Sequence, residues 1–61
     1  MSERSEQIAD QLESLVAELD ELAFDQLRAA AAEGETRRPE SDKRLTAARR
    51  SLEKAINLLR D

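Results

Sequence analysis

Residues 33–39 read Glu-Gly-Glu-Thr-Arg-Arg-Pro, and they divide the chain into two amphipathic halves. Gly34 can adopt the left-handed backbone conformation that commonly ends a helix. Pro39 cannot lie inside a helix but fits the first turn of a new one. A glycine followed five residues later by a proline therefore predicts a short connection between two helices. Because the connection is short, the two helices should run antiparallel as a hairpin.

The half of the chain before this connection has the apolar pattern of a long amphipathic helix. Its large apolar residues recur at alternating intervals of four and three, the spacing that keeps side chains on one helical face. The row contains Ile8, Leu12, Leu15, Leu19 and Leu22, and it is widened by Val16, Ala23 and Leu27. A stripe this wide is typical of a helix bundle rather than of a two-stranded coiled coil. We therefore predict a helix over about residues 3–32.

The half after the connection predicts a second helix over about residues 39–60. Its apolar row alternates leucine with alanine at intervals of three and four. The row contains Leu45, Ala48, Leu52, Ala55 and Leu59, with Ile56 beside it. Large residues that alternate with small ones allow a close approach of another helix. The residues between the two helices, about 33–38, form the predicted loop.

The two apolar rows match as an antiparallel pair. The expected layers pair Gln26 and Leu27 with Leu45, Ala23 with Ala48, Leu19 with Leu52, Val16 with Ala55, Leu15 with Ile56, and Leu12 with Leu59. In this register the residues up to Ile8 project past the end of the second helix. We expect that end to fray unless a second copy of the chain covers it.

Charge favours the same pairing. Residues 1–32 carry eight acidic and two basic side chains, a net charge of −6. Residues 40–61 carry four acidic and six basic side chains, a net charge of +2. Exposed ion pairs contribute little each, but together they favour an acidic helix against a basic one. We expect Asp20 and Glu21 to lie near Arg49 and Arg50.

Length and composition predict that one hairpin needs further stabilisation. The 61 residues form a single domain of 39% apolar and 39% charged residues with a net charge of −4. A core this small gives marginal stability. The chain contains no cysteine, so disulfides and thiolate zinc sites cannot add to it. The fold class that we predict is therefore all-α: an antiparallel two-helix hairpin that dimerises into a four-helix bundle.

The usual residues of catalysis and of cofactor binding are missing. Without histidine or cysteine there is no common general base and no thiol nucleophile. One glycine cannot build a phosphate-binding loop. Glu18, Glu21 and Asp25 share one side of the first helix, but carboxylate metal sites in helix bundles usually include histidine. We expect no enzymatic activity, no metal and no cofactor.

The same features bear on location. No apolar run approaches the length of a membrane span, and residues 1–6 lack the apolar segment of a signal peptide. We therefore expect no membrane insertion and a cytoplasmic location.

Phe24 is the single aromatic residue and the candidate contact with a partner. At 3.6 residues per turn it lies about 140° from the centre of the Leu12–Leu19 row, so it cannot enter the core of the hairpin. Aromatic residues often anchor interfaces. We favour a contact with a second copy, since one hairpin has a small core. The alternatives are an adaptor that docks onto a larger protein through Phe24, and an ordinary exposed phenylalanine.

Lys43, Arg50 and Lys54 share the outer face of the second helix and form a candidate basic strip. Proteins that bind nucleic acid are usually strongly basic and often add aromatic or loop elements, whereas this chain is acidic overall. We interpret the strip as a solvated face and keep a nucleic-acid-associated regulator as the alternative. The leading hypothesis is a structural or protein-interaction module that acts as a homo-oligomer.

Overall fold

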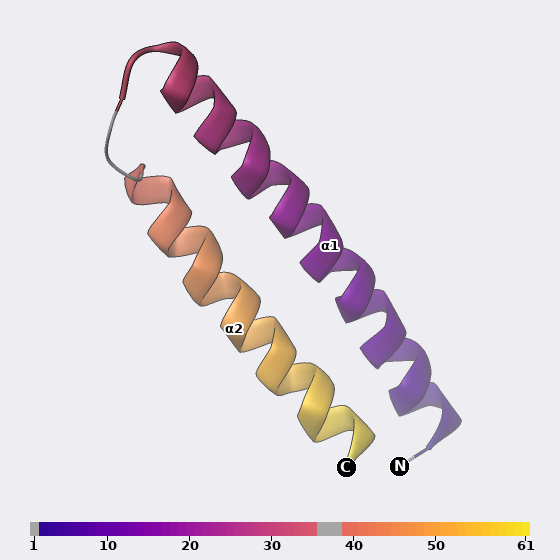
Figure 1. Ribbon diagram of the computed structural model, residues 1–61. Helices are drawn as coiled ribbons and strands as arrows, with labels where there is room; N and C mark the ends of the chain where they lie inside the picture. The colour runs from indigo at the N-terminus through magenta and orange to yellow at the C-terminus, as the bar shows by residue number, and fades with distance from the viewer. Residues whose placement is uncertain (1, 36–38) are drawn as a thin grey trace.

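The computed structural model describes residues 2–35 and 39–61. Two helices, α1 (Glu3–Ala32) and α2 (Glu40–Arg60), lie side by side and run in opposite directions, so that both ends of the chain meet at one end of the hairpin (Figure 1). The prediction of an all-helical chain whose two helices pack on each other is confirmed. The predicted loop includes residues 36–38, which lie outside the described residues.

Groups that the local sequence supplies cap both ends of α1. At the start, Ser2 has an extended backbone and its hydroxyl accepts a hydrogen bond from the amide of Ser5 at 3.1 Å. At the other end, the amide of Glu35 donates to the carbonyl of Ala30 at 3.0 Å. That bond requires the chain to reverse at Gly34, whose φ of +86° lies in the left-handed region. The left-handed conformation of Gly34 therefore ends α1.

Replacing Gly34 by alanine should lower the free energy of unfolding by about 1 kcal/mol, because a Cβ is strained in the left-handed region. No described atom lies within 4 Å of the added Cβ, so the backbone alone sets the cost. Thermal unfolding followed by circular dichroism should show a Tm about 4–8 °C lower. Glu35→Ala, where φ is not positive, is the matched control and should leave Tm nearly unchanged. Equal Tm values for the two variants would contradict this role of Gly34.

The charges at the ends of α2 agree with its dipole. Pro39 precedes the helix with a φ of −59°, and its carbonyl accepts a hydrogen bond from the amide of Asp42 at 3.0 Å. Glu40 and Asp42 lie in the first turn and Arg60 in the last. Acids at the start and a base at the end are the signs that the helix dipole favours.

The apolar core of the hairpin is small. It consists of Ala9 and Val16 from α1 and Ile56 from α2, with Leu12, Leu52 and Leu59 packed against them. Within residues 2–35 and 39–61, no large side chain is fully buried. The Cα atoms extend over 48 × 14 × 10 Å, which is a single layer of two helices. One layer leaves much of each apolar stripe uncovered, whereas stable domains pack at least two layers.

The packing differs from the expected layers because α2 covers a different side of α1. Ala48, expected inside the hairpin core, is exposed, and Leu15 remains 46% exposed. Ala9, which lies outside the predicted set, is completely buried. The leucine row of α1 is wider than one helix can cover, and α2 packs against the edge of it that carries Ala9 and Val16. The expected core positions of Ala48 and Leu15 are therefore wrong for the single hairpin.

Asp10 lies at the level of Arg60, so the start of α1 extends past α2, but the expected fraying of this end is not seen. Arg60, in the last turn of α2, reaches Glu6 at 2.8 Å and Asp10 at 2.7 Å. The long side chain of Arg60 reaches these carboxylates, which lie beyond the reach of the apolar side chains at the end of α2. Ion pairs therefore hold this end of the hairpin, and α1 is helical from Glu3.

Candidate interaction surface

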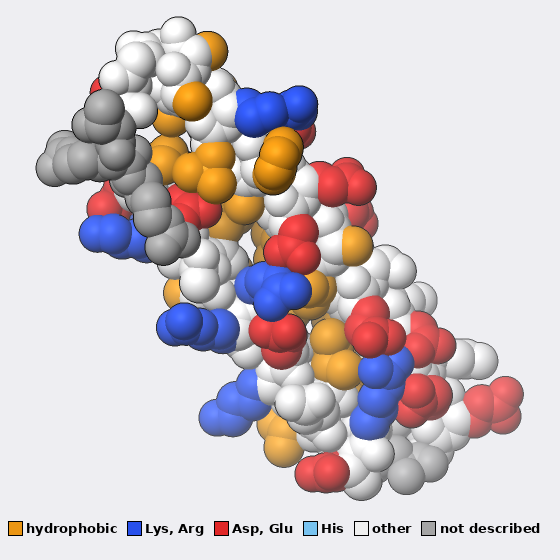
Figure 2. All heavy atoms as spheres, viewed as in Figure 1, with side chains coloured by type: hydrophobic (Ala, Val, Ile, Leu, Met, Phe, Trp, Pro, Cys, Tyr) orange, Lys and Arg blue, Asp and Glu red, His pale blue; other side chains and the backbone are white. Residues whose placement is uncertain are grey.

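The seam between α1 and α2 has two sides of different chemistry. On the side seen in Figure 2, acidic and basic side chains lie next to one another along the junction of the helices. The other side carries an apolar groove lined by Leu15, Glu18, Leu19, Leu22 and Leu52. At 3.6 residues per turn, Glu13 and Asp20 lie about 160° around α1 from Leu15 and Leu22. We call these sides the charged face and the apolar groove.

Two arginines of α2 organise the charged face. Arg60 contacts Glu13 at 2.8 Å in addition to its two carboxylate partners near the start of α1. Arg49 contacts Asp20 at 2.8 Å and Glu53 at 3.2 Å. The prediction that Asp20 lies near Arg49 is confirmed. These pairs between the helices fix which levels of α1 and α2 lie opposite each other.

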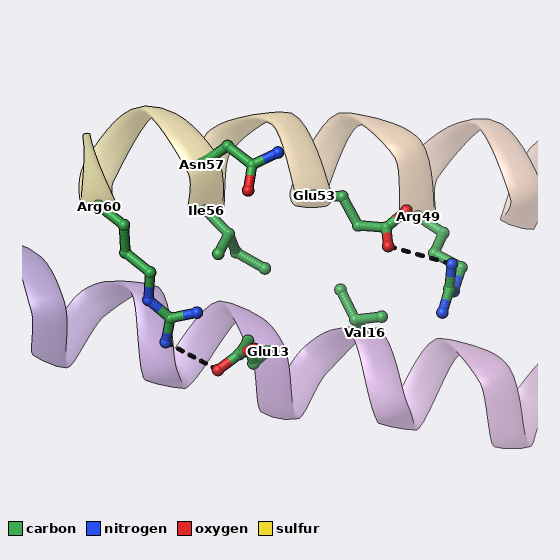
Figure 3. A pocket seen from close by; sticks show the side chains of 7 residues that line it. All are labelled: Glu13, Val16, Arg49, Glu53, Ile56, Asn57 and Arg60. Carbon is green, nitrogen blue, oxygen red and sulfur yellow. Dashed lines mark hydrogen bonds and ion pairs between the residues drawn. The ribbon is translucent and has the colours of Figure 1, made fainter.

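Figure 3 shows how this side is built. Val16 of α1 and Ile56 of α2 point toward one another, and the two arginines lie on either side of them. The guanidinium of Arg60 holds the pKa of Glu13 below its usual value, first by a hydrogen bond and second by its charge. The hydrogen bond to Glu13 is likewise the main cause that raises the pKa of Arg60. Because these groups are exposed, the pairs contribute more to register than to stability.

Arg60→Gln should return the pKa of Glu13 to the usual range of a glutamate. The folded state lowers this pKa, so the contact stabilises the protein above the unfolded pKa of Glu13 and is lost as pH falls through the folded one. Titration of the Glu13 carboxyl carbon by NMR measures the change. Arg50→Gln is the control, since Arg50 forms no ion pair within the described part of the chain. A Glu13 pKa that stays low in Arg60→Gln would contradict the assignment.

The apolar groove leaves large side chains exposed. Leu15 and Leu22 are 46% and 45% exposed, although both belong to the predicted row. Leu19 and Leu52 are half-buried between the helices, where they contribute to the same groove. Ile8 is 38% exposed one heptad before Leu15, so the exposed strip extends toward the start of α1. A continuous apolar strip of this kind marks an interaction site more often than scattered exposed leucines do.

The same side of the hairpin holds a polar atom without a partner. Gln26 follows Leu22 by one turn and is half-buried. Its Oε1 is buried and accepts no hydrogen bond from the residues described. A buried acceptor without a donor is destabilising by about 1–3 kcal/mol.

At 3.6 residues per turn, Ala48 and Ala55 lie about 40° and 60° around α2 from Leu52, on the side away from Arg49 and thus beside the groove. Ala48 is exposed, and Ala55 is half-buried. They are seven residues apart, as are Leu15 and Leu22 on α1.

The remaining predicted residues divide between core and surface: Leu12, Val16, Leu52, Ile56 and Leu59 form or contact the core, Ala23 and Leu45 are half-buried, and Leu27 is 38% exposed.

Phe24 lies away from the groove. It is 62% exposed, and the guanidinium of Arg28 stacks 5.2 Å from the centre of its ring. Arg28 is held there by Asp25 at 2.7 Å. At 3.6 residues per turn, Phe24 is about 170° around α1 from the midpoint of Leu15 and Leu22. A partner that fills the groove therefore leaves Phe24 uncovered.

The candidate basic strip stays on the outer face of α2. Lys43, Arg50 and Lys54 are all exposed. Lys43 lies 3.9 Å from Glu40 of the same helix, so an acid partly offsets the charge of the strip at its start.

Within residues 2–35 and 39–61, no set of three or more acidic side chains is arranged to hold a metal ion. Neither described helix has the length and apolarity needed to cross a membrane. Comparisons with protein-family models, with curated proteins and with solved structures gave no match. The features of the molecule that bear on its function are therefore the charged face, the apolar groove and Phe24.

Proposed function

We propose that the chain is a structural, protein-interaction module that works as a homodimer, in which two hairpins pack through their apolar grooves into a four-helix bundle. The observation that carries this proposal is the exposure of Leu15 and Leu22 beside the half-buried Leu19 and Leu52. Transfer of these side chains from water to a second layer of helices is favourable at about 25 cal/mol per Å² of apolar surface.

The small core of the hairpin supports the same proposal. Three buried apolar residues and three partly buried leucines must hold two long helices together. Chains of this length usually need a disulfide, a metal or association to be stable. With no cysteine in the chain, association is the route that the composition leaves open.

A second copy of the chain is the occupant that we propose for the groove. Closed two-fold dimers are by far the commonest oligomers, and their interface must be complementary to itself. The groove side has exposed leucines on α1 and alanines on α2, so it holds both halves of a complementary surface. Phe24 and the basic strip lie outside this interface and stay accessible to any further partner.

The dependence of Tm on chain concentration tests the proposed function. If folding and dimerisation are coupled, mass action raises Tm as the concentration increases. Thermal unfolding over about a hundredfold range of concentration should show this rise. A cooperative transition with the same Tm throughout that range would contradict the dimer.

A further inference from the structure

We propose that α1 of each chain packs on α2 of the other, with the two-fold axis parallel to the helices; this inference rests on the proposed dimer. Two hairpins can meet groove to groove in two symmetric ways. An axis parallel to the helices places α1 on the partner's α2, and an axis across them places α1 on the partner's α1. Neighbouring helices are antiparallel in both arrangements, so the side chains must decide between them.

The register of the hairpin gives the levels at which residues meet. Asp10 lies opposite Arg60, and Asp20 lies opposite Arg49. Leu15 is midway between the two aspartates, and position 55 is about midway between the two arginines. A two-fold axis parallel to the helices keeps every residue at its own level. Leu15 therefore meets Ala55 of the partner subunit.

Size complementarity continues along the contact. Leu22 lies seven residues after Leu15, and Ala48 lies seven residues before Ala55. On antiparallel helices, Leu22 then meets the partner's Ala48, which is exposed in the hairpin. Leu15 and Leu22 thus both pack over alanines, which is how large and small residues fill a core without voids.

The polar positions agree with the same register. Glu18 lies in the groove between Leu15 and Leu22, at the level of the partner's Ser51, whose hydroxyl can donate to a carboxylate.

The other arrangement is less complementary. With an axis across the middle of the groove, Leu15 meets the partner's Leu22, and alanines meet alanines. Glu18 then lies near Glu18 of the partner subunit. Two helices that each carry a net charge of −6 would be neighbours, whereas the proposed arrangement places an acidic helix on one of charge +2. Size and charge therefore both favour α1 on the partner's α2.

Mixing two size variants tests this contact. A homodimer of Leu15→Ala has two cavities, and a homodimer of Ala55→Leu has two overpacked contacts. In the proposed arrangement their heterodimer restores one large and one small residue at each contact. Native mass spectrometry of an equilibrated equimolar mixture should show a ratio of heterodimer to either homodimer at least about tenfold above that of the statistical 1:2:1 distribution. Phe24→Ala, a truncation on the side of α1 away from the groove, should mix statistically with Ala55→Leu.

A cysteine pair gives a second test, which measures proximity rather than packing. The natural chain has no cysteine, so Leu22→Cys, Ala48→Cys and Leu15→Cys each introduce a single thiol. Mild oxidation of mixed folded Leu22→Cys and Ala48→Cys chains should yield mainly the disulfide between the two different chains. Efficient linking of Leu22→Cys to Leu15→Cys, without linking to Ala48→Cys, would overturn the proposed contact.

The outcomes distinguish the two levels of the proposal. If the natural chain is monomeric, the proposed function fails and this inference fails with it. If the natural chain is dimeric but the size variants mix statistically and the cysteine pair does not cross-link, only the arrangement is wrong.

Discussion

Leu22→Asp is expected to dissociate the dimer. Leu22 is partly exposed in one hairpin, but a second hairpin on the apolar groove would bury it. Burial of an unpaired carboxylate costs several kcal/mol, so the dissociation constant should rise by at least about a hundredfold. Sedimentation velocity should show the mass fall to that of one chain. Helicity at the same concentration should fall with it, because the hairpin alone has a small core.

Phe24→Asp is the matched control for this variant. It introduces the same charge into the same helix two residues away, on the opposite side of α1 from the groove. Phe24 is 62% exposed in the hairpin, and the proposed dimer leaves it uncovered. The variant should remain dimeric with nearly unchanged helicity. If Phe24→Asp dissociates the protein and Leu22→Asp does not, the interface lies on the Phe24 side.

Ile56→Ala is expected to have the largest effect on stability among single truncations. Ile56 is 6% exposed and packs with Val16 at the centre of the hairpin core. Removal of three carbon atoms there loses the transfer free energy and leaves a cavity, which together cost about 2–5 kcal/mol per site. Denaturant unfolding at fixed chain concentration measures the loss.

Lys54→Ala is the control for this truncation. Lys54 lies two residues before Ile56 on the outer face of α2 and is exposed, so its truncation should change the free energy of unfolding by about 0.5 kcal/mol or less. Equal losses at positions 54 and 56 would contradict the core described above.

The division of the chain into two helices could be predicted because local signals carry it. Gly34 and Pro39 interrupt the chain, and the apolar residues on either side recur at helical spacing. The contact between Asp20 and Arg49 could be predicted because opposite net charge on the two halves limits the pairing. The two helices and this ion pair could be predicted because the local sequence and the charge leave few other arrangements.

The side of α1 that α2 covers could not be predicted in the same way. The leucine row spans more of α1 than one helix can contact, so the sequence allowed several faces. The burial of Ala9 shows which face α2 covers. In the sequence, the one indication of that face was that Ala9, a small residue, lies seven positions before Val16. The three carboxylates around Arg60 were also missed. Their spacing of four and three along α1 indicates a common face, and it was the available clue.

The structure moves the candidate interaction surface from Phe24 to the apolar groove. From the sequence, Phe24 was the favoured contact with a second copy. In the structure, the exposed leucines and Phe24 lie on opposite sides of α1, so one partner copy cannot cover both. The proposed self-interface is therefore the apolar groove, and Phe24 stays free.

Sedimentation equilibrium of the natural chain decides whether two hairpins associate. At micromolar concentration we expect a species with twice the mass of the chain, whose helicity is lost as dilution separates the two copies. A helical species with the mass of a single chain at every concentration would contradict the dimer.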